Sequence, residues 1–497
     1  MEPLNNTNQV KMLLLMLFNS VFVLVFSYIL FNIVINPNNY FIEMNGWIIS
    51  IGSLMLLGIL ILIDRGIKQI REKKYLLLIS ILNLSIIIGL QWFFFKYFKV
   101  TPTWDFGHVY DSALQLKDEF TYVQPYFYVQ FPNNIPVLLL FVGIMRFLDF
   151  IGIHDYLPCF IIINMLVVIL SIVCLYVFIY RRTNLSHITT LSFLLVIITP
   201  LYTYTTIVYT DTLTMIFPIL SLLMYDFFYH SEDRKFKYVW LVFLGICLAI
   251  GTLIKANVII TLIAILIHYF MTTKWKSSLI FMVVLLIPFI STNYVYQKVI
   301  DPIIPVEDEE LGYPTTHWLM MGLNHSGKIY GGFNIGDVHI TAELKKDGLS
   351  NNDITKQHIK IIKERLSNYG VQGYLEFLSK KINFTWGEGT YYAPDKLIRS
   401  PLGENKYQQY VFGDKQTTFV YGSQISHTLI LFLIVIAGCS LFRQRISFEV
   451  VLSITLFGVF LFLLFWETRS RYLVLYIPVM LALASHGLYK INCKINK

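Results

Sequence analysis

The chain has 497 residues, of which 56% are hydrophobic and only 14% are charged, and its mean hydropathy is +0.61. Soluble domains carry about 25% charged residues, so this composition excludes a soluble protein. The formal net charge of +8 does not predict nucleic-acid binding, because the basic residues stand in short clusters between apolar runs. Five cysteines without metal-ligand spacing predict neither a zinc site nor a disulfide framework.

Twelve apolar runs are long enough to cross a bilayer core of about 30 Å. Helices satisfy their own backbone groups in lipid, so we predict an all-α polytopic membrane protein with about twelve transmembrane helices. The first run is too long for a signal-peptide core and is predicted to be a retained anchor. The predicted helices cover residues 12–35, 47–64, 75–95, 156–180, 188–207, 210–229, 238–254, 256–271, 278–295, 425–442, 448–466 and 471–489.

Basic residues mark alternate connections between these helices. The connections at 36–46 and 201–209 carry none. The positive-inside rule places the basic set in the cytoplasm, which predicts a plasma-membrane protein with two cytoplasmic termini and an extracytoplasmic functional face. The set holds 18 of the 39 basic residues: Lys11, Arg65, Lys68, Arg71, Lys73, Lys74, Arg181, Arg182, Arg234, Lys235, Lys237, Lys274, Lys276, Arg443, Arg445, Lys490, Lys494 and Lys497.

Four regions follow from this topology. Residues 1–74 form a two-helix membrane hairpin, and residues 75–295 form a transmembrane core with a first outer loop at 96–134. The apolar segment 135–153 contains Arg146 and Asp149, and counting it as a crossing would invert the charge asymmetry downstream, so we predict a helix at the outer interface.

The remaining two regions are an extracytoplasmic loop at 296–424 and C-terminal transmembrane helices at 425–497. The loop opens with an acidic stretch at 301–310. Apolar and basic residues then alternate at helical spacing over 354–366 and 371–382, which predicts one or two amphipathic helices on the membrane face of the loop.

Several ionisable residues fall at the outer edge of the predicted helices, where charges cost a few kcal/mol and are functional candidates. Each also has an ordinary structural explanation. Lys255 could extend to the interface, the two arginines could anchor a helix, and either aspartate could cap one. A purely structural interpretation requires all of these explanations to hold at once, and it must also account for acids and bases lying at one depth in the membrane. The candidates are Asp105, Asp211, Lys255, Glu467, Arg469 and Arg471.

A carboxylate facing cations at a lipid interface suits the transfer of a group from a lipid phosphate. The carboxylate can act as general base on an acceptor hydroxyl, while lysine and arginine hold phosphate oxygens. Nucleotide-activated donors are made in the cytoplasm and would not reach this face. The chain also has no Rossmann fingerprint or P-loop. A sugar carried on a polyprenyl phosphate within the membrane fits the geometry.

Four segments carry a resemblance to a known family. The segments TWDFGHVYDSA and YFYVQFPNNIPVLLLF, then GTLIKAN and WETRSRYLVLYIPVML, follow one another along the chain. In this order they resemble the GT-C-fold membrane glycosyltransferases, above all the family-39-like branch with the protein O-mannosyltransferases and aminoarabinose transferases. PTTHWLMMGLN and TWGEGTYY further resemble a group of integral membrane proteins of Gram-positive bacteria.

The resemblance implies roles for individual residues. Asp105 matches the first-loop catalytic acid, and Asp211 matches a second acid near the site. Lys255 matches the lysine close to the donor phosphate, and Arg469 and Arg471 stand where phosphate contacts are expected.

The first loop also departs from the branch. Enzymes of the branch often carry paired acids in this loop. This chain has Asp105 followed by Phe106, and its next acid is Asp111. This departure puts a metal-assisted variant of the reaction in doubt, although a divalent metal stays open. The first two helices stand outside the resembling region.

Three residues of the long loop are further candidates. His317 and Trp318 could cover the site and bind a sugar face, and Glu388 near Trp386 has the same standing. Packed loop residues explain all three equally well.

The sequence thus predicts an inverting glycosyltransferase that moves a sugar from a polyprenyl-phosphate donor to an extracytoplasmic glycan, glycolipid or protein, among membrane lipids. A multi-helix transporter or lipid flippase is the main alternative, and a non-catalytic envelope-assembly protein is the second. Transporters place their sites near the bilayer midplane, whereas the charges here favour one face.

Overall fold

The computed structural model describes residues 6–37, 41–118, 128, 130–300, 312–442 and 447–495. The acidic stretch 301–310, Arg443, Arg445 and Lys497 lie outside the described residues, as do residues 119–127 and 129 of the first outer loop.

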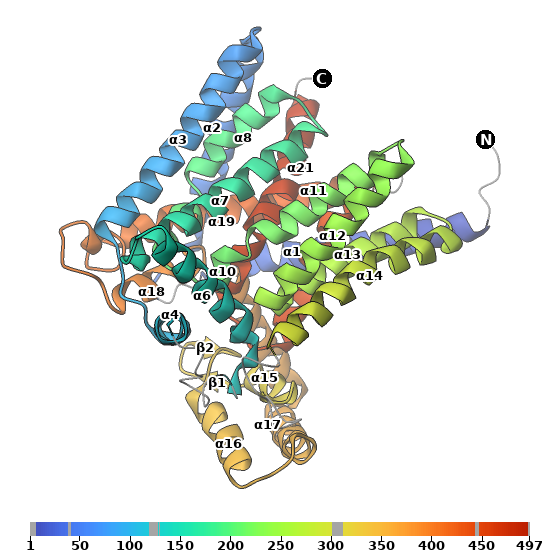
Figure 1. Cartoon of the computed structure of the whole chain (residues 1–497). Helices are drawn as coiled ribbons and strands as arrows, with labels where there is room; N and C mark the ends of the chain where they lie inside the picture. Colours follow the sequence, from blue (N-terminus) through green and yellow to red (C-terminus); the bar gives the residue numbers. More distant parts are fainter. Residues whose placement is uncertain are drawn as a thin grey trace.

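The described chain is an all-α bundle (Figure 1). Ten helical stretches are long and apolar enough to cross a membrane, and three shorter apolar helices accompany them. Together they include every one of the twelve predicted helices, which confirms the predicted fold class. The helices of the bundle are α1 (Asn6–Ile35), α2 (Gly46–Gln69), α3 (Lys73–Tyr97), α7 (Tyr156–Tyr180), α8 (Leu185–Val196), α11 (Ile216–His230), α12 (Arg234–Ile254), α13 (Ile259–Thr272), α14 (Trp275–Ile300), α19 (Thr417–Leu441), α20 (Val450–Phe465) and α21 (Ile477–Ile495).

The predicted helix at 188–207 is wrong in its length. Helix α8 ends at Val196, and the chain continues through a separate turn, α9 (Pro200–Thr203). Pro200 lacks the N–H that a continuing helix needs, and it stands instead at the first position of α9, where that N–H is not required. Asn164 of α7 secures this break by donating hydrogen bonds of 2.9 Å to the carbonyl oxygens of Tyr204 and Thr205.

Helix α21 lies at the centre of the bundle, and most of it is buried within the protein. It packs closely on α19, where a Cβ on Gly487 would stand only 2.1 Å from the carbonyl oxygen of Leu433. Only glycine permits this approach. Close backbone contact of this kind drives helix association in lipid, where the hydrophobic effect between helices is absent.

The amino-terminal hairpin is part of this packing rather than an addition to its outside. Helix α1 packs against α19 and α17 (Asn351–Trp386), and α2 packs against α19 and α8. The rings of Phe22 and Phe26 are fully buried, and the ring of Phe26 meets Trp386 edge-on with centroids 5.5 Å apart. Helices α1 and α2 therefore pack within the bundle, against the long loop and the C-terminal helices.

The connecting elements gather at the end of the bundle opposite both termini (Figure 1). The two predicted amphipathic segments of the long loop form a single α17 with a break at Gly370, whose φ is 60°. The sequence did not predict the loop's other helices or its strand pair. The elements at this end are α4 (Trp104–Leu116), η1 (Pro132–Asn134), α6 (Ile135–Phe150), α15 (Thr316–Met321), β1 (His325–Ser326), β2 (Ile329–Tyr330), α16 (Ile335–Lys346), α17 (Asn351–Trp386), α18 (Ala393–Ile398) and η3 (Gln408–Tyr410).

Helix α6 is the segment predicted to lie at the interface. Residues Pro132–Phe150 are apolar and long enough to count as a span by composition. The helix packs chiefly on α4 and runs across the ends of the long helices in Figure 1. Its interfacial position stays a prediction.

Cysteine labelling tests the predicted sidedness. In a background with exposed Cys439 and Cys493 replaced by serine, we expect a membrane-impermeant maleimide to label Lys346→Cys in intact cells. Glu232→Cys, in a basic connection, should react only after permeabilisation, because basic connections stay in the cytoplasm. Both substituted residues are exposed. The reverse labelling pattern would invert the topology.

Candidate active site

Three charged side chains from three separate helix ends meet around one buried carboxylate. Lys255 Nζ donates a hydrogen bond to Asp211 Oδ1, and Nη1 of Arg471 lies 3.5 Å from Asp211 Oδ2. Asp211 is only 1% exposed. The carboxylate therefore holds two cations that would be costly without it.

Each residue of this group stands where a helix is interrupted. Asp211 lies in the single turn α10 (Thr210–Leu213). Lys255 caps α12 with extended backbone, which separates α12 from the following 3₁₀ turn η2 (Ala256–Val258). Arg471 lies in the 3₁₀ helix η4 (Ser470–Tyr476). The candidate membrane spans begin at Thr210, end at Ile254 and begin at Ser470, so the three charges sit at span edges.

A short backbone pairing brings the first outer loop to the long loop. Val100 and Pro401 form an antiparallel β-bridge, and the N–H of Thr101 donates to the carbonyl oxygen of Ser400 at 2.8 Å. This pairing sets the start of α4 beside α18. Lys396 of α18 consequently places its Nζ 4.1 Å from the centre of the Trp104 ring.

These contacts continue as a chain that links all four basic side chains of the site. Cζ of Arg471 lies 5.4 Å from the centre of the Trp104 ring. On the other side, the Lys396 ammonium lies 5.9 Å from the Tyr392 ring, and the Arg469 guanidinium lies 3.7 Å from the same ring. Arg469 also donates a 2.6 Å hydrogen bond to the Tyr392 hydroxyl.

Asp105 stands in the first turn of α4, directly after Trp104, and is half-buried. It lies within electrostatic range of Lys396 and Arg471. Among the described residues its carboxylate has no hydrogen bond or ion pair. Asp105 is thus the acid of this group whose oxygens are available to a ligand.

Backbone strain is concentrated at this group. In the described chain three residues other than glycine have positive φ: Trp104 at 50°, Tyr391 at 54° and Tyr392 at 64°. Such residues cost about 1–3 kcal/mol each and cluster at functional sites. Two of the three side chains contact the cations described above.

Glu388 holds this strained turn. Its carboxylate accepts hydrogen bonds from the backbone N–H groups of Thr390 and Tyr392 at 2.8 and 2.7 Å. It also accepts one from the hydroxyl of Ser470 at 2.7 Å. These contacts join the loop to η4 through Glu388, and its predicted role as a covering residue stays a prediction.

The other predicted residues lie apart from the group. Asp111 is on the exposed side of α4. His317 is buried against Thr341, whose hydroxyl is 2.7 Å from Nδ1, and burial lowers the pKa of this histidine to about 4. Trp318 stacks on Trp466 with ring centres 6.5 Å apart, beside the turn that carries Glu467. Of this set only Trp318 adjoins the site.

Glu467 is committed to a hydrogen bond. The hydroxyl of Tyr472 donates to its Oε2 at 2.6 Å, and the Tyr472 ring also faces Lys255 at 5.1 Å. Glu467 therefore supports the aromatic ring beside the charged group.

Sequence reasoning missed Lys396, Trp104 and Tyr392. Lys396 stands in a polar loop, where a lysine is ordinary, yet the structure leaves it 7% exposed. Burial and the neighbouring Arg471 and Arg399 lower the pKa of Lys396 to about 6. A lysine soon after the aromatic pair Tyr391–Tyr392 was a weak signal at best.

No three histidine, cysteine, aspartate or glutamate side chains converge as metal ligands in the described part of the chain. The acids of the site are instead paired with cations or isolated.

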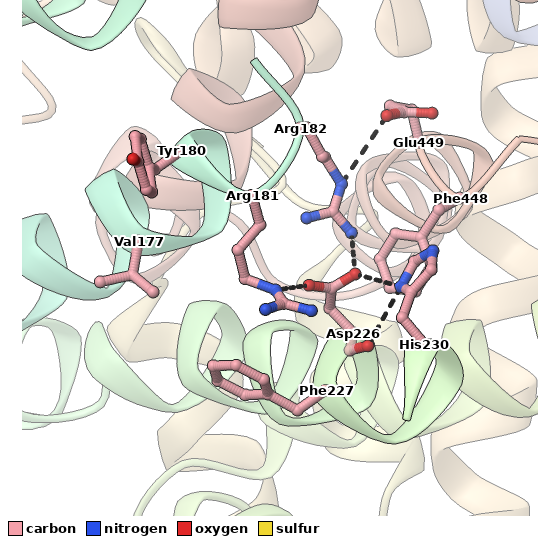
Figure 2. A pocket seen from close by; sticks show the side chains of 9 residues that line it. All are labelled: Val177, Tyr180, Arg181, Arg182, Asp226, Phe227, His230, Phe448 and Glu449. Atoms are coloured by element: carbon pink, nitrogen blue, oxygen red, sulfur yellow. Dashed lines mark hydrogen bonds and ion pairs between the residues drawn. The ribbon is translucent and has the colours of Figure 1, made fainter. Parts of the chain in front are cut away.

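A second charged group lines a cavity of about 770 Å³ at the other end of the bundle (Figure 2). Asp226, 1% exposed, accepts hydrogen bonds from Arg181 and from Arg182 at 2.6 Å, and His230 Nδ1 lies 2.7 Å away. Glu449 stands 3.7 Å from Arg182. The two acids balance the two arginines, and the group joins α7, α11 and the start of α20.

Comparison with known proteins places the chain among integral membrane proteins. The family model described as "Conserved hypothetical integral membrane protein" matches residues 5–490, including the amino-terminal hairpin. No curated protein matches the chain.

Among solved structures, the chain is similar to the archaeal oligosaccharyltransferase AglB from Archaeoglobus fulgidus in complex with an inhibitory peptide and a dolichol-phosphate. The identity is 12% and the TM-score is 0.46, over 85% of this chain and 51% of that one. The chain thus spans about half the length of that enzyme.

A double-mutant cycle tests the buried group. Asp211→Asn leaves Lys255 and Arg471 without a counter-charge, so we expect it to lower the free energy of unfolding by about 3–5 kcal/mol. In the Asp211→Asn background, Lys255→Met should lower the free energy of unfolding by less than it does in the wild-type protein, because it removes one of the two unpaired cations. Thermal unfolding in detergent gives the measurement. Asp111→Asn, on the exposed side of α4, is the neutral control, and strictly additive effects would contradict the coupling.

Proposed function

The chain belongs to this family of integral membrane proteins, and from that premise we propose that it is a membrane glycosyltransferase. It moves a sugar from a polyprenyl-phosphate donor to an extracytoplasmic acceptor, which is a cell-envelope glycan, a glycolipid or a protein. This agrees with the resemblance of its sequence segments to the family-39-like GT-C enzymes.

One observation carries the proposal: three cations and the amine of Lys396 meet at span edges around one available acid. Lys255, Arg471, Lys396 and Arg469 follow one another through the contacts of Asp211, Trp104 and Tyr392. Asp211 neutralises part of this charge, which leaves an excess suited to a phosphate. A phosphate carried on a membrane lipid lies at the depth where transmembrane helices end and headgroups begin.

The reaction is a single displacement with inversion. Asp105 removes the proton from the acceptor hydroxyl, and the acceptor oxygen forms a bond to the anomeric carbon of the sugar. The bond between that carbon and the phosphate oxygen breaks on the opposite side. The polyprenyl phosphate leaves with the electron pair, and the lysine and arginine side chains stabilise its new charge.

The position of the charges favours this reaction over transport. Transporters bind their cargo near the bilayer midplane between repeated halves. Here the cationic chain lies at span edges, and the residues that close it come from the two connecting loops rather than from the bundle interior. An assembly protein without catalysis would not need an available carboxylate beside these cations.

Substitution of Asp105 tests the proposal. Asp105→Asn keeps the size of the side chain but removes the base, so we expect transfer to fall by about 100-fold or more. The protein should fold as before, because the carboxylate has no partner among the described residues to lose. The assay is transfer from a polyprenyl-phosphate sugar in proteoliposomes, with mass spectrometry of envelope glycans from cells with and without the gene.

Asp111→Asn is the matched control, since it changes an exposed acid on the same helix and should leave transfer unchanged. Near-wild-type transfer by Asp105→Asn would remove this residue from the mechanism. Movement of solute or lipid without sugar transfer would replace the enzyme with the transporter.

A further inference from the structure

Lys396 has an environment that a lysine rarely occupies. The residue is 7% exposed, and its ammonium faces the rings of Trp104 at 4.1 Å and Tyr392 at 5.9 Å. Within the described residues, Nζ makes no hydrogen bond and no ion pair. The Lys396 side chain is buried as a whole, and the two aromatic faces are the contacts that the described protein gives its ammonium, so up to three N–H donors are open to a ligand or water.

The neighbours of Lys396 do not compensate its charge. The groups that act on it are Arg471 and Arg399, which oppose a positive charge, and Asp395 and Asp105, which favour one. Asp395 is already paired with Arg399 at 2.8 Å. An additional anion near Lys396 and Arg471, which both lie against the Trp104 ring, would compensate their charge.

We propose that Lys396 binds the phosphate of the lipid donor and takes up one proton from solvent as that phosphate arrives. The inference rests on the proposed function, because it names the donor phosphate as the ligand. It adds a residue, a change of protonation state and a pH dependence to that site.

The direction of the coupling follows from the charges. Without ligand the pKa of Lys396 is lowered to about 6, mainly by burial, so the amine is mostly neutral at pH 7.5. A phosphate beside it favours the ammonium and raises this pKa. Binding is therefore strongest below about pH 6 and weakens with rising pH, by about tenfold per unit for one proton, until the pKa of the bound state is passed.

The probe should keep one charge throughout. A polyprenyl phosphate methyl ester in detergent micelles is a phosphodiester whose single negative charge does not change between pH 6 and 8.5. Titration calorimetry of the whole protein at pH 7.5, in buffers of different ionisation enthalpy, gives the protons taken up as a slope. We expect about one proton per bound lipid, and a dissociation constant that rises about tenfold from pH 6.5 to 7.5.

Two substitutions separate charge from packing. Lys396→Arg stays protonated, so it should bind without proton uptake and with a nearly constant dissociation constant over this range. Lys396→Met should bind at least about tenfold more weakly, again without uptake, yet unfold at a higher temperature because a buried amine is replaced by an apolar chain. Lys406→Met changes an exposed lysine of the same loop and should behave as wild type.

The inference is overturned if the wild-type protein binds the lipid without taking up a proton, or if Lys396→Arg takes up as many protons as wild type. Either result would leave sugar transfer by the wild-type protein intact and would remove only Lys396. Proton-linked binding without any sugar transfer would support the Lys396 site and overturn the enzyme. Absence of lipid binding would overturn both.

Discussion

The shared carboxylate of Asp211 is the contact on which this end of the protein depends. Lys255 and Arg471 come from different helix ends, and each would be costly at the edge of hydrocarbon without a counter-charge. Pairing both with one buried acid fixes the relative positions of α10, the end of α12 and the start of η4. The aromatic rings and loop residues then pack on helix ends whose relative positions are already fixed.

The group around Asp226 is also a buried acid paired with two cations, but its role is purely structural. Its two arginines lie just after α7, where cations favour the negative end of the helix dipole. Asp226 and Glu449 balance them, and the contacts close on themselves. The group around Asp211 instead continues outward through Trp104 to Lys396 and beyond, and it includes an acid that has no partner among the described residues.

The long loop is docked on this end by buried polar contacts. Lys381 is 1% exposed, and its Nζ donates to the carbonyl oxygens of Gly322 and Trp466 at 2.6 and 2.8 Å. Glu388 joins the strained turn to Ser470. Because the turn that carries Arg469 and Arg471 is held by the loop, the cations lie on preorganised backbone, as electrostatic stabilisation of a leaving group requires.

The sequence by itself determined the apolar helices and the edge positions of Asp211, Lys255 and Arg471. Hydrocarbon penalises every unpaired polar group, so both features are visible in a single chain. Only the tertiary structure decided that Lys396 joins them, that Asp111 and His317 do not, and that Pro200 ends a helix predicted to continue. Polar loops outside hydrocarbon pay no penalty for unpaired polar groups and show no hydrophobic periodicity, so their contacts cannot be predicted from the sequence. The pairing of Val100 with Pro401 joins segments that are too distant in the chain for any local pattern to reveal.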